Sequence, residues 1–170
     1  MTDSIPKVAN LKNQWLSQHV DVQYPTQESL AGRKLYLSSV EKRSIQPFTL
    51  TKEDNGFISA DDIFLVDFHR LTVMFALLQS KRWTESSEQE LIVEFLTQII
   101  YSEPCELYIG FTEGEPTAAA IVTRTDSAIL VSDIITTNED AQQSAKQFAA
   151  SLLHKLDINL DEYSDAYLEI

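Results

Sequence analysis

The spacing of apolar residues divides the second half of the chain into predicted helices and strands. Over residues 88–100 apolar side chains recur at helical spacing, with glutamates and glutamines on the opposite side. This pattern predicts an amphipathic helix that packs one stripe on a core. Residues 63–78 are apolar nearly all round, so they predict a helix that is buried on most sides. The helical region is expected to end at Glu103, because the residue before a proline is pushed out of the helical conformation.

Beyond Pro104 the apolar period shortens from about 3.6 residues to about 2, which is typical of strands. Residues 106–112 and 117–125 flank the turn at residues 113–116, so they predict a hairpin. Residues 128–136 predict a third strand after a short break. We therefore expect three consecutive antiparallel strands that form a meander.

The C-terminal part of the chain predicts one helix and one short strand. Residues 137–140 form a capping-box pattern, which predicts that a helix starts near Asn138. Its apolar stripe is expected to pack on the sheet through Phe148 and Leu152. Residues 166–170 predict the last strand.

The N-terminal part carries weaker signals. Residues 11–19 predict a short helix, and a polar stretch that contains a proline follows. Residues 34–40 and 44–51 are rich in β-forming residues and predict two strands, and Pro47 restricts the second one to a sheet edge. We interpret residues 1–43 as an N-terminal extension.

Length and charge narrow the class of protein. A chain of 170 residues fits one α+β domain, here residues 44–170 with the extension in front. The net charge is −13, and it is uneven, at +2 for residues 1–50 and −15 for residues 51–170. Such a charge repels nucleic acid and anionic membrane surfaces, so neither is expected as a partner.

Cysteine content and hydropathy indicate the compartment. Cys105 is the single cysteine, which excludes an intramolecular disulfide. No apolar run approaches the ~18 residues that a membrane span needs. We therefore expect a cytoplasmic protein.

The predicted order of strand, helix, helix, three strands, helix and strand resembles the first two thirds of the GNAT fold, that of the N-acetyltransferases in the acyl-CoA N-acyltransferase superfamily. The resemblance covers roughly residues 44–170. Residues 45–54 are similar to the family's first strand, and residues 127–136 resemble its central strand. The resemblance to the GNAT fold implies a central, mostly antiparallel sheet flanked by helices, and acetyl-CoA or another acyl-CoA as the cofactor.

The resemblance also implies a cofactor site. In that family the central strand pairs with the pantetheine arm of acetyl-CoA, and the segment after it cradles the pyrophosphate. Glycines in that segment let backbone N–H groups approach phosphates closely, but this chain has none there, and Glu139 and Asp140 add negative charge. The implied positions are three for backbone pairing and five beside the pyrophosphate: Ile134, Ile135 and Thr136, then Gln142, Gln143, Ser144, Ala145 and Lys146.

Two residues are candidates for catalysis. Asp133 lies in the predicted central strand and could serve as the general base for an amine, because acetyl transfer requires a deprotonated amine. Strand alternation places Asp133 on one face with Val131 and Ile135, where it faces a cleft or solvent. Tyr163 is a candidate general acid by resemblance to a late tyrosine of the family, and aromatic packing is the alternative.

Two local patterns have structural explanations that we favour. Residues 51–62 are similar to an EF-hand loop, but a turn at Asn55-Gly56 followed by a helix cap at Ser59 explains them better. Asp67 and Arg70 interrupt the apolar run at the spacing of an i,i+3 ion pair.

Two functions are consistent with these features. The first is an acyl-CoA-dependent N-acyltransferase-like protein, with a small-molecule or protein acceptor, whose pyrophosphate loop is lost or rebuilt. The alternative is a non-catalytic binding or regulatory protein that self-associates through a sheet edge. Because the predicted sheet ends one strand pair early, we expect either a homodimer or a cover formed by residues 1–43.

Overall fold

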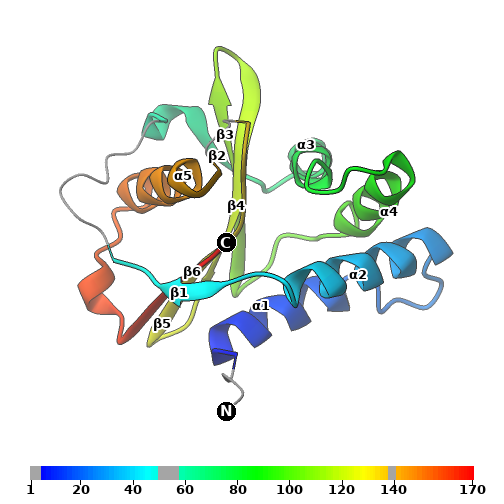
Figure 1. Cartoon of the computed structure of the whole chain (residues 1–170), viewed down its shortest axis with the longest axis horizontal. Coiled ribbons are helices and arrows are strands. Elements are labelled where there is room, and N and C mark those ends of the chain that lie inside the picture. The colour runs from blue at the N-terminus through cyan, green and yellow to red at the C-terminus, as the bar shows by residue number, and fades with distance from the viewer. Residues whose placement is uncertain (1–4, 50–57, 138–140) are drawn as a thin grey trace.

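The computed structural model describes residues 5–49, 58–137 and 141–170, of which 141–143 are described by their backbone alone. Its centre is a six-stranded mixed sheet with the strand order β1-β6-β5-β4-β3-β2, flanked by helices on both faces (Figure 1). The strands are β1 (Ile45–Pro47), β2 (Ile63–Leu65), β3 (Cys105–Thr112), β4 (Glu115–Arg124), β5 (Ala128–Thr136) and β6 (Asp165–Glu169). The helices are α1 (Lys7–Gln18), α2 (Gln27–Val40), α3 (His69–Ser80), α4 (Ser86–Leu96) and α5 (Ala141–Lys155), with short 3₁₀ turns η1 (Ala60–Asp62) and η2 (Leu160–Glu162).

The meander and the final helix confirm the sequence prediction. Strands β3, β4 and β5 pair antiparallel in chain order, and α5 then crosses over so that β6 pairs parallel with β5. Helix α5 packs on the sheet through Phe148 and Leu152, both fully buried. The predicted α+β class with a central, mostly antiparallel sheet is therefore confirmed.

The two faces of the sheet carry separate cores. Helix α5 covers one face alone, and α1, α2, α3 and α4 lie on the other (Figure 1). Trp15, Leu16 and Tyr36 from the first two helices are buried together with Phe95 of α4. The N-terminal helices therefore share a core with the sheet. None of the helices described is both long and apolar enough to cross a membrane.

The predicted strand at residues 34–40 is wrong, because this segment belongs to α2. Thr26 caps that helix by accepting a hydrogen bond from the backbone N–H of Ser29 at 3.1 Å. Helix α2 then crosses α4 so closely that a Cβ on Gly32 would lie 2.0 Å from the carbonyl oxygen of Leu91. Tertiary packing against α4 thus outweighs the local preference for a strand.

The predicted helix at residues 63–78 is wrong in its first part. This segment starts with strand β2, and α3 begins only at His69. Ser59 caps η1 instead of an α-helix, by accepting a hydrogen bond from the N–H of Asp61. A short run that is apolar on all sides fits a buried strand as well as a buried helix, which is why periodicity misassigned it. Asp67 and Arg70 are both exposed, and within the described residues they form no ion pair.

Both edge strands are only three residues long. Strand β1 pairs with β6 and covers that side of the sheet, and it ends at Pro47, which confirms the predicted edge position. Strand β2 forms the opposite edge beside β3. Short edge strands expose few unpaired backbone groups to another chain.

Candidate functional site

A β-bulge positions Asp133 in the middle of β5. The β4–β5 register shifts between Ala119 and Ile121, so that Asp133 and Ile134 together stand opposite the single residue Ala120. Asp133 has a φ of 53°, in the left-handed region, which aspartate adopts more readily than most other residues with a side chain. The bulge therefore changes which face each following side chain takes.

The predicted alternation along β5 is wrong at this bulge. Val131 and Ile134 both pack in the core on the α5 side, although strict alternation would separate them. Ile135 packs in the core on the other side. Asp133 bonds residues of α1 and α2, so its carboxylate lies on the side of the N-terminal helices.

Asp133 belongs to a buried network of four charges. The Lys12 ammonium nitrogen lies 3.0 Å from Asp133 Oδ2 and 3.2 Å from Glu169 Oε2. Arg43 Nη1 lies 2.6 Å from Asp133 Oδ1 and 2.7 Å from Glu169 Oε1. None of the four side chains is more than 7% exposed. Two cations and two carboxylates thus balance each other between α1, the turn after α2, and strands β5 and β6.

Two hydroxyl groups complete the network around Asp133. The Tyr36 hydroxyl accepts a hydrogen bond from Lys12 at 2.8 Å and donates one to Asp133 Oδ1 at 2.7 Å. The Ser132 hydroxyl donates to Asp133 Oδ2 at 2.8 Å. With Lys12 and Arg43, each carboxylate oxygen of Asp133 therefore has two donors, which fills its capacity as an acceptor.

The surrounding charges keep Asp133 ionised. Burial raises the pKa of the Asp133 carboxyl, but attraction to Lys12 and Arg43 outweighs it and holds this pKa well below the usual range. Burial and the nearby Asp133 charge raise the pKa of the Tyr36 hydroxyl well above its usual value. A carboxylate that stays ionised and fully hydrogen-bonded is a poor general base at neutral pH.

Side chains from α3 and the turn after it occupy backbone carbonyls of β5. Gln79 Nε2 donates to the carbonyl oxygen of Asp133 at 2.5 Å, and Arg82 Nη2 donates to that of Ile134. Ile134 is one of the three positions whose backbone was expected to pair with a cofactor. Its carbonyl is instead bonded within the protein.

The remaining residues of the expected cofactor site are distributed between the sheet and α5. Ile135 and Thr136 pair with Ala119 and Ala118 of β4. Ser144 and Ala145 are buried on α5, and Lys146 is half-buried. Gln142 and Gln143 lie in the first turn of α5, where only the backbone is described, and Glu139 and Asp140 lie outside the described residues.

The structure does not bring the two candidate catalytic residues together. Tyr163 follows η2 and packs against the core on the α5 side, whereas the Asp133 carboxylate lies on the opposite side of the sheet. Tyr163 lines a hollow with Glu106 and Arg124. The Asn55-Gly56 turn lies outside the described residues, and within those residues no three His, Cys, Asp or Glu side chains form a potential metal site.

A hollow of about 500 Å³ opens beside the network, and we call it the basic hollow. Arg43 forms part of its wall, so the hollow borders the buried charges directly. Lys42 and Arg82 line it as well. The other lining residues come from α2, the α3–α4 turn, α4 and the end of the chain: Leu35, Ser38, Ser39, Trp83, Glu88 and Ile170.

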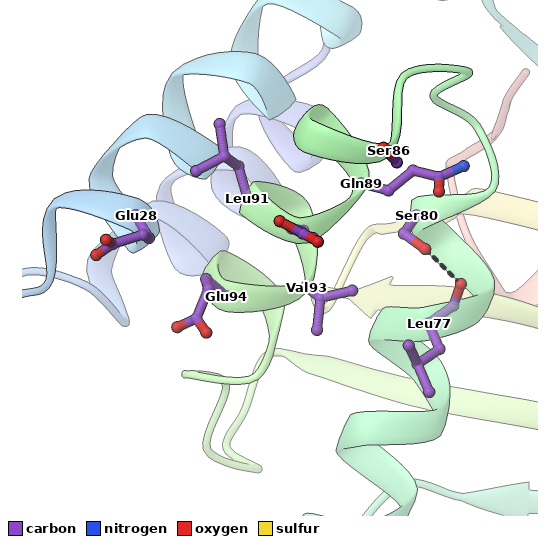
Figure 2. Close-up of a pocket in the computed structure, with 9 residues that line it drawn as sticks. Glu28, Leu77, Ser80, Ser86, Gln89, Leu91, Val93 and Glu94 are labelled. Atoms are coloured by element: carbon purple, nitrogen blue, oxygen red, sulfur yellow. Dashed lines mark hydrogen bonds between the residues drawn. The ribbon is translucent and has the colours of Figure 1, made fainter.

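A second hollow, of about 490 Å³, lies between α2, α3 and α4, and we call it the acidic hollow (Figure 2). Glu28 and Glu94 stand at its margin with Leu77 and Val93, and the Ser80 hydroxyl donates to the carbonyl of Leu77 at 2.7 Å. Its lining includes no cationic side chain. The two hollows thus have similar volumes and opposite charge.

The sequence interpretation missed most of the network. Lys12 could have been noticed, because it lies within the buried stripe of α1 between Val8, Ala9, Trp15 and Leu16. A lysine at such a position needs a buried partner. No comparable signal marks Tyr36, Arg43 or Glu169 as its partners.

Comparison with known proteins does not place the chain in a family. No protein family matches it, and no curated protein matches it either. Among solved structures, one similar chain is a functionally unknown conserved protein from Staphylococcus epidermidis ATCC 12228, with 13% sequence identity and a TM-score of 0.47. The match covers 99% of this chain and 72% of that one. A TM-score of this size carries no argument about function.

Proposed function

We propose that the protein is a non-catalytic binding protein built on a GNAT-like core, in which its own side chains occupy the place of an acyl-CoA. The order of helices and strands along the chain supports a GNAT-like core. A three-strand meander leads through α5 to a last strand that joins the same sheet. This is the arrangement expected from the resemblance to the N-acetyltransferases.

The state of Asp133 is the observation that carries the proposal. An acyltransferase of this kind needs a group that can take a proton from the attacking amine. The Asp133 carboxylate is only 2% exposed and accepts hydrogen bonds or ion pairs from Lys12, Tyr36, Arg43 and Ser132. An incoming amine would have to displace at least one of these donors. We therefore assign the Asp133 carboxylate a structural role instead of a catalytic one.

Occupied backbone positions support the same conclusion. A pantetheine arm pairs with free N–H and C=O groups along a strand edge. Here the Ile134 carbonyl is bonded to Arg82, and the preceding carbonyl is bonded to Gln79. Binding of a CoA arm would require both side chains to move.

A catalytic N-acyltransferase is the second candidate, and one observation favours it. The parallel pairing of β5 with β6 extends only to Val131 and Leu168, so the last residues of β5 are not paired with β6. Such a divergence leaves backbone groups of Ile135 and Thr136 that an acyl-CoA could reach. This candidate requires the side chains of Gln79 and Arg82 to move away from β5.

Isothermal titration of acetyl-CoA into the full chain tests the proposal. We expect binding no tighter than about 1 mM, which corresponds to only ~4 kcal/mol. The variant Arg82→Ala frees the Ile134 carbonyl, with Lys81→Ala as a control at the neighbouring exposed position. Under our proposal neither variant gains affinity. Micromolar binding by the natural protein, or a gain of tenfold or more in Arg82→Ala alone, favours the second candidate instead.

Self-association through a sheet edge is not part of the proposal. Both edge strands have three residues, and Pro47 removes one backbone donor from β1. A homodimer remains a prediction that sedimentation velocity can test, independently of the acetyl-CoA titration.

A further inference from the structure

The basic hollow contains cations whose charge is not neutralised within the structure. Among the described residues, neither Lys42 nor Arg82 lies within ion-pair distance of a carboxylate. Arg82 has two neutral acceptors, the side-chain oxygen of Gln79 at 3.2 Å and the carbonyl of Ile134. Both cations are exposed, so a ligand in the hollow can reach them.

Arg43 adds a third positive group to the wall. Its Nη1 is used by Asp133 and Glu169, while its Nη2 lies 3.3 Å from the hydroxyl of Ser39. The inner edge of this guanidinium therefore faces the buried carboxylates, and its other nitrogen faces a residue of the hollow. Arg82 has exposed surface, but its guanidinium is partly desolvated where it bonds to Gln79 and Ile134. This desolvation, together with repulsion by Arg43, lowers the pKa of Arg82.

The charge of the hollow is opposite to that of the whole protein. The chain carries a net charge of −13, yet Glu88 is the one acidic side chain among the lining residues, against the two unpaired cations Lys42 and Arg82. The acidic hollow shows that a cavity of similar size elsewhere on the molecule has the opposite composition. The unpaired cations Lys42 and Arg82 on one cavity attract an anion, while the charge of Arg43 is balanced by Asp133 and Glu169.

The other lining residues indicate the shape of the ligand. The hydroxyl of Ser38 is a potential donor to an oxyanion, whereas that of Ser39 donates to the carbonyl oxygen of Tyr36 at 2.7 Å. Leu35 and the half-buried Trp83 offer apolar surface in the same hollow. A volume of about 500 Å³ lies in the range of about 300–1,000 Å³ that is usual for small-molecule sites.

We propose that the basic hollow binds a small organic anion, whose carboxylate or phosphate group contacts Lys42 and Arg82 and whose apolar or aromatic part lies against Trp83 and Leu35. This inference rests on the proposed binding function, because it names the ligand class of a non-catalytic binding protein. The anion adds a charge-assisted partner to Arg82 and offsets its repulsion from Arg43.

Calorimetric titration of the full chain with phenyl phosphate tests the inference. Inorganic phosphate lacks the ring, and benzylamine keeps the ring but reverses the charge. We expect phenyl phosphate to bind with a dissociation constant of about 1 mM or tighter. Inorganic phosphate should bind more weakly, and benzylamine should not bind.

Matched variants locate the binding. Lys42→Gln and Arg82→Gln each remove one cation of the hollow, and each should weaken phenyl phosphate binding by about tenfold, the usual effect of losing a hydrogen bond to a charged group. Lys81→Gln removes the same charge from an exposed neighbour that does not line the hollow, and it should have little effect. Lys42 is exposed, and among the described residues its ammonium group forms no ion pair, so its variant should keep the fold even if Arg82→Gln does not.

Two results would overturn the inference. One is the absence of phenyl phosphate binding in the millimolar range, and the other is an equal loss of affinity in Lys42→Gln and Lys81→Gln. Equal affinities for inorganic phosphate and phenyl phosphate would remove the role of Trp83 and Leu35. Each of these results is distinct from failure of the proposed function, which depends on acetyl-CoA and on Arg82→Ala.

Discussion

The two sides of β5 stabilise the protein in different ways. On the α5 side Val131 and Ile134 pack against Phe148 and Leu152 in an apolar core. On the other side, one residue away along the strand, Asp133 forms ion pairs with Lys12 and Arg43 in a region that is just as buried. The bulge in β5 places the Asp133 carboxylate on this side of the sheet.

This difference shows how geometry and burial contribute separately to stability. Apolar contacts have little directional preference, so the α5 side depends mainly on the volume of its side chains. Buried ions are stable only if every partner is in place, because each unpaired charge retains its full desolvation cost. The ionic side should therefore respond more sharply to the loss of one group and to pH.

The largest effect is expected from Lys12→Ala. Removal of this ammonium leaves Asp133 and Glu169 facing each other with Arg43 as their one remaining cation. Breaking a buried ion pair in this way should lower the free energy of unfolding by about 4 kcal/mol. Urea unfolding measures the change, and Lys7→Ala, at an exposed position of the same helix, is the control. A loss below about 1 kcal/mol, the size usual for surface pairs, would show that the network adds little.

A smaller effect is expected from Leu152→Ala on the apolar side. Leu152 is fully buried in the α5 core, and its truncation leaves a cavity that should cost about 3 kcal/mol. Leu156→Ala, at a half-buried position directly after that helix, should cost less. If Leu152→Ala is more damaging than Lys12→Ala in the same urea experiment, our ranking of the two sides is wrong.

The two sides should also differ in their response to acid. The pKa of Asp133 in the folded protein lies well below its value in the unfolded chain, about 3.9. Its contribution to stability is therefore complete above that unfolded value and is lost as pH falls towards the folded pKa, because the unfolded chain binds the proton first.

Urea unfolding at several pH values between about 6 and 3 measures this dependence. The natural protein and Leu152→Ala should lose stability in parallel, since both keep the network. Asp133→Asn, which cannot bind that proton, should show a shallower dependence. Identical slopes in all three proteins would mean that Asp133 does not titrate as its contacts indicate.

The smallest effect concerns Cys105, which lies in the core on the side of the N-terminal helices. The thiol is 1% exposed, and burial raises its pKa to about 12. Because the thiolate is the reactive form, we expect almost no reaction of the folded protein with a thiol reagent at pH 8. Lys12→Ala should react faster, because it opens that side more often, and Leu152→Ala should react less quickly than Lys12→Ala. Fast labelling of the natural protein would contradict the closed packing described here.

Regular periodicity was sufficient to predict much of the fold. The period change at Pro104 and the apolar stripe of α5 are local features, so the meander, the final helix and the last strand could be predicted. The errors at residues 34–40 and 63–65 arose because tertiary contacts, and not local features, determine the structure there. Close contact at Gly32 decided the first, and pairing with β3 decided the second.

The candidate site shows the same division. From the chain alone Asp133 was singled out as an ionisable residue within an apolar strand, and that much was correct. Its partners Lys12, Tyr36 and Arg43 lie at least 90 residues away in the sequence, and no local pattern links them to it. The bulge that turns the carboxylate towards them depends on how β4 and β5 pair. Side-chain periodicity reports the environment along one helix or strand, but an ion network forms between several of them. The structural role of Asp133 could therefore be recognised only from the tertiary structure.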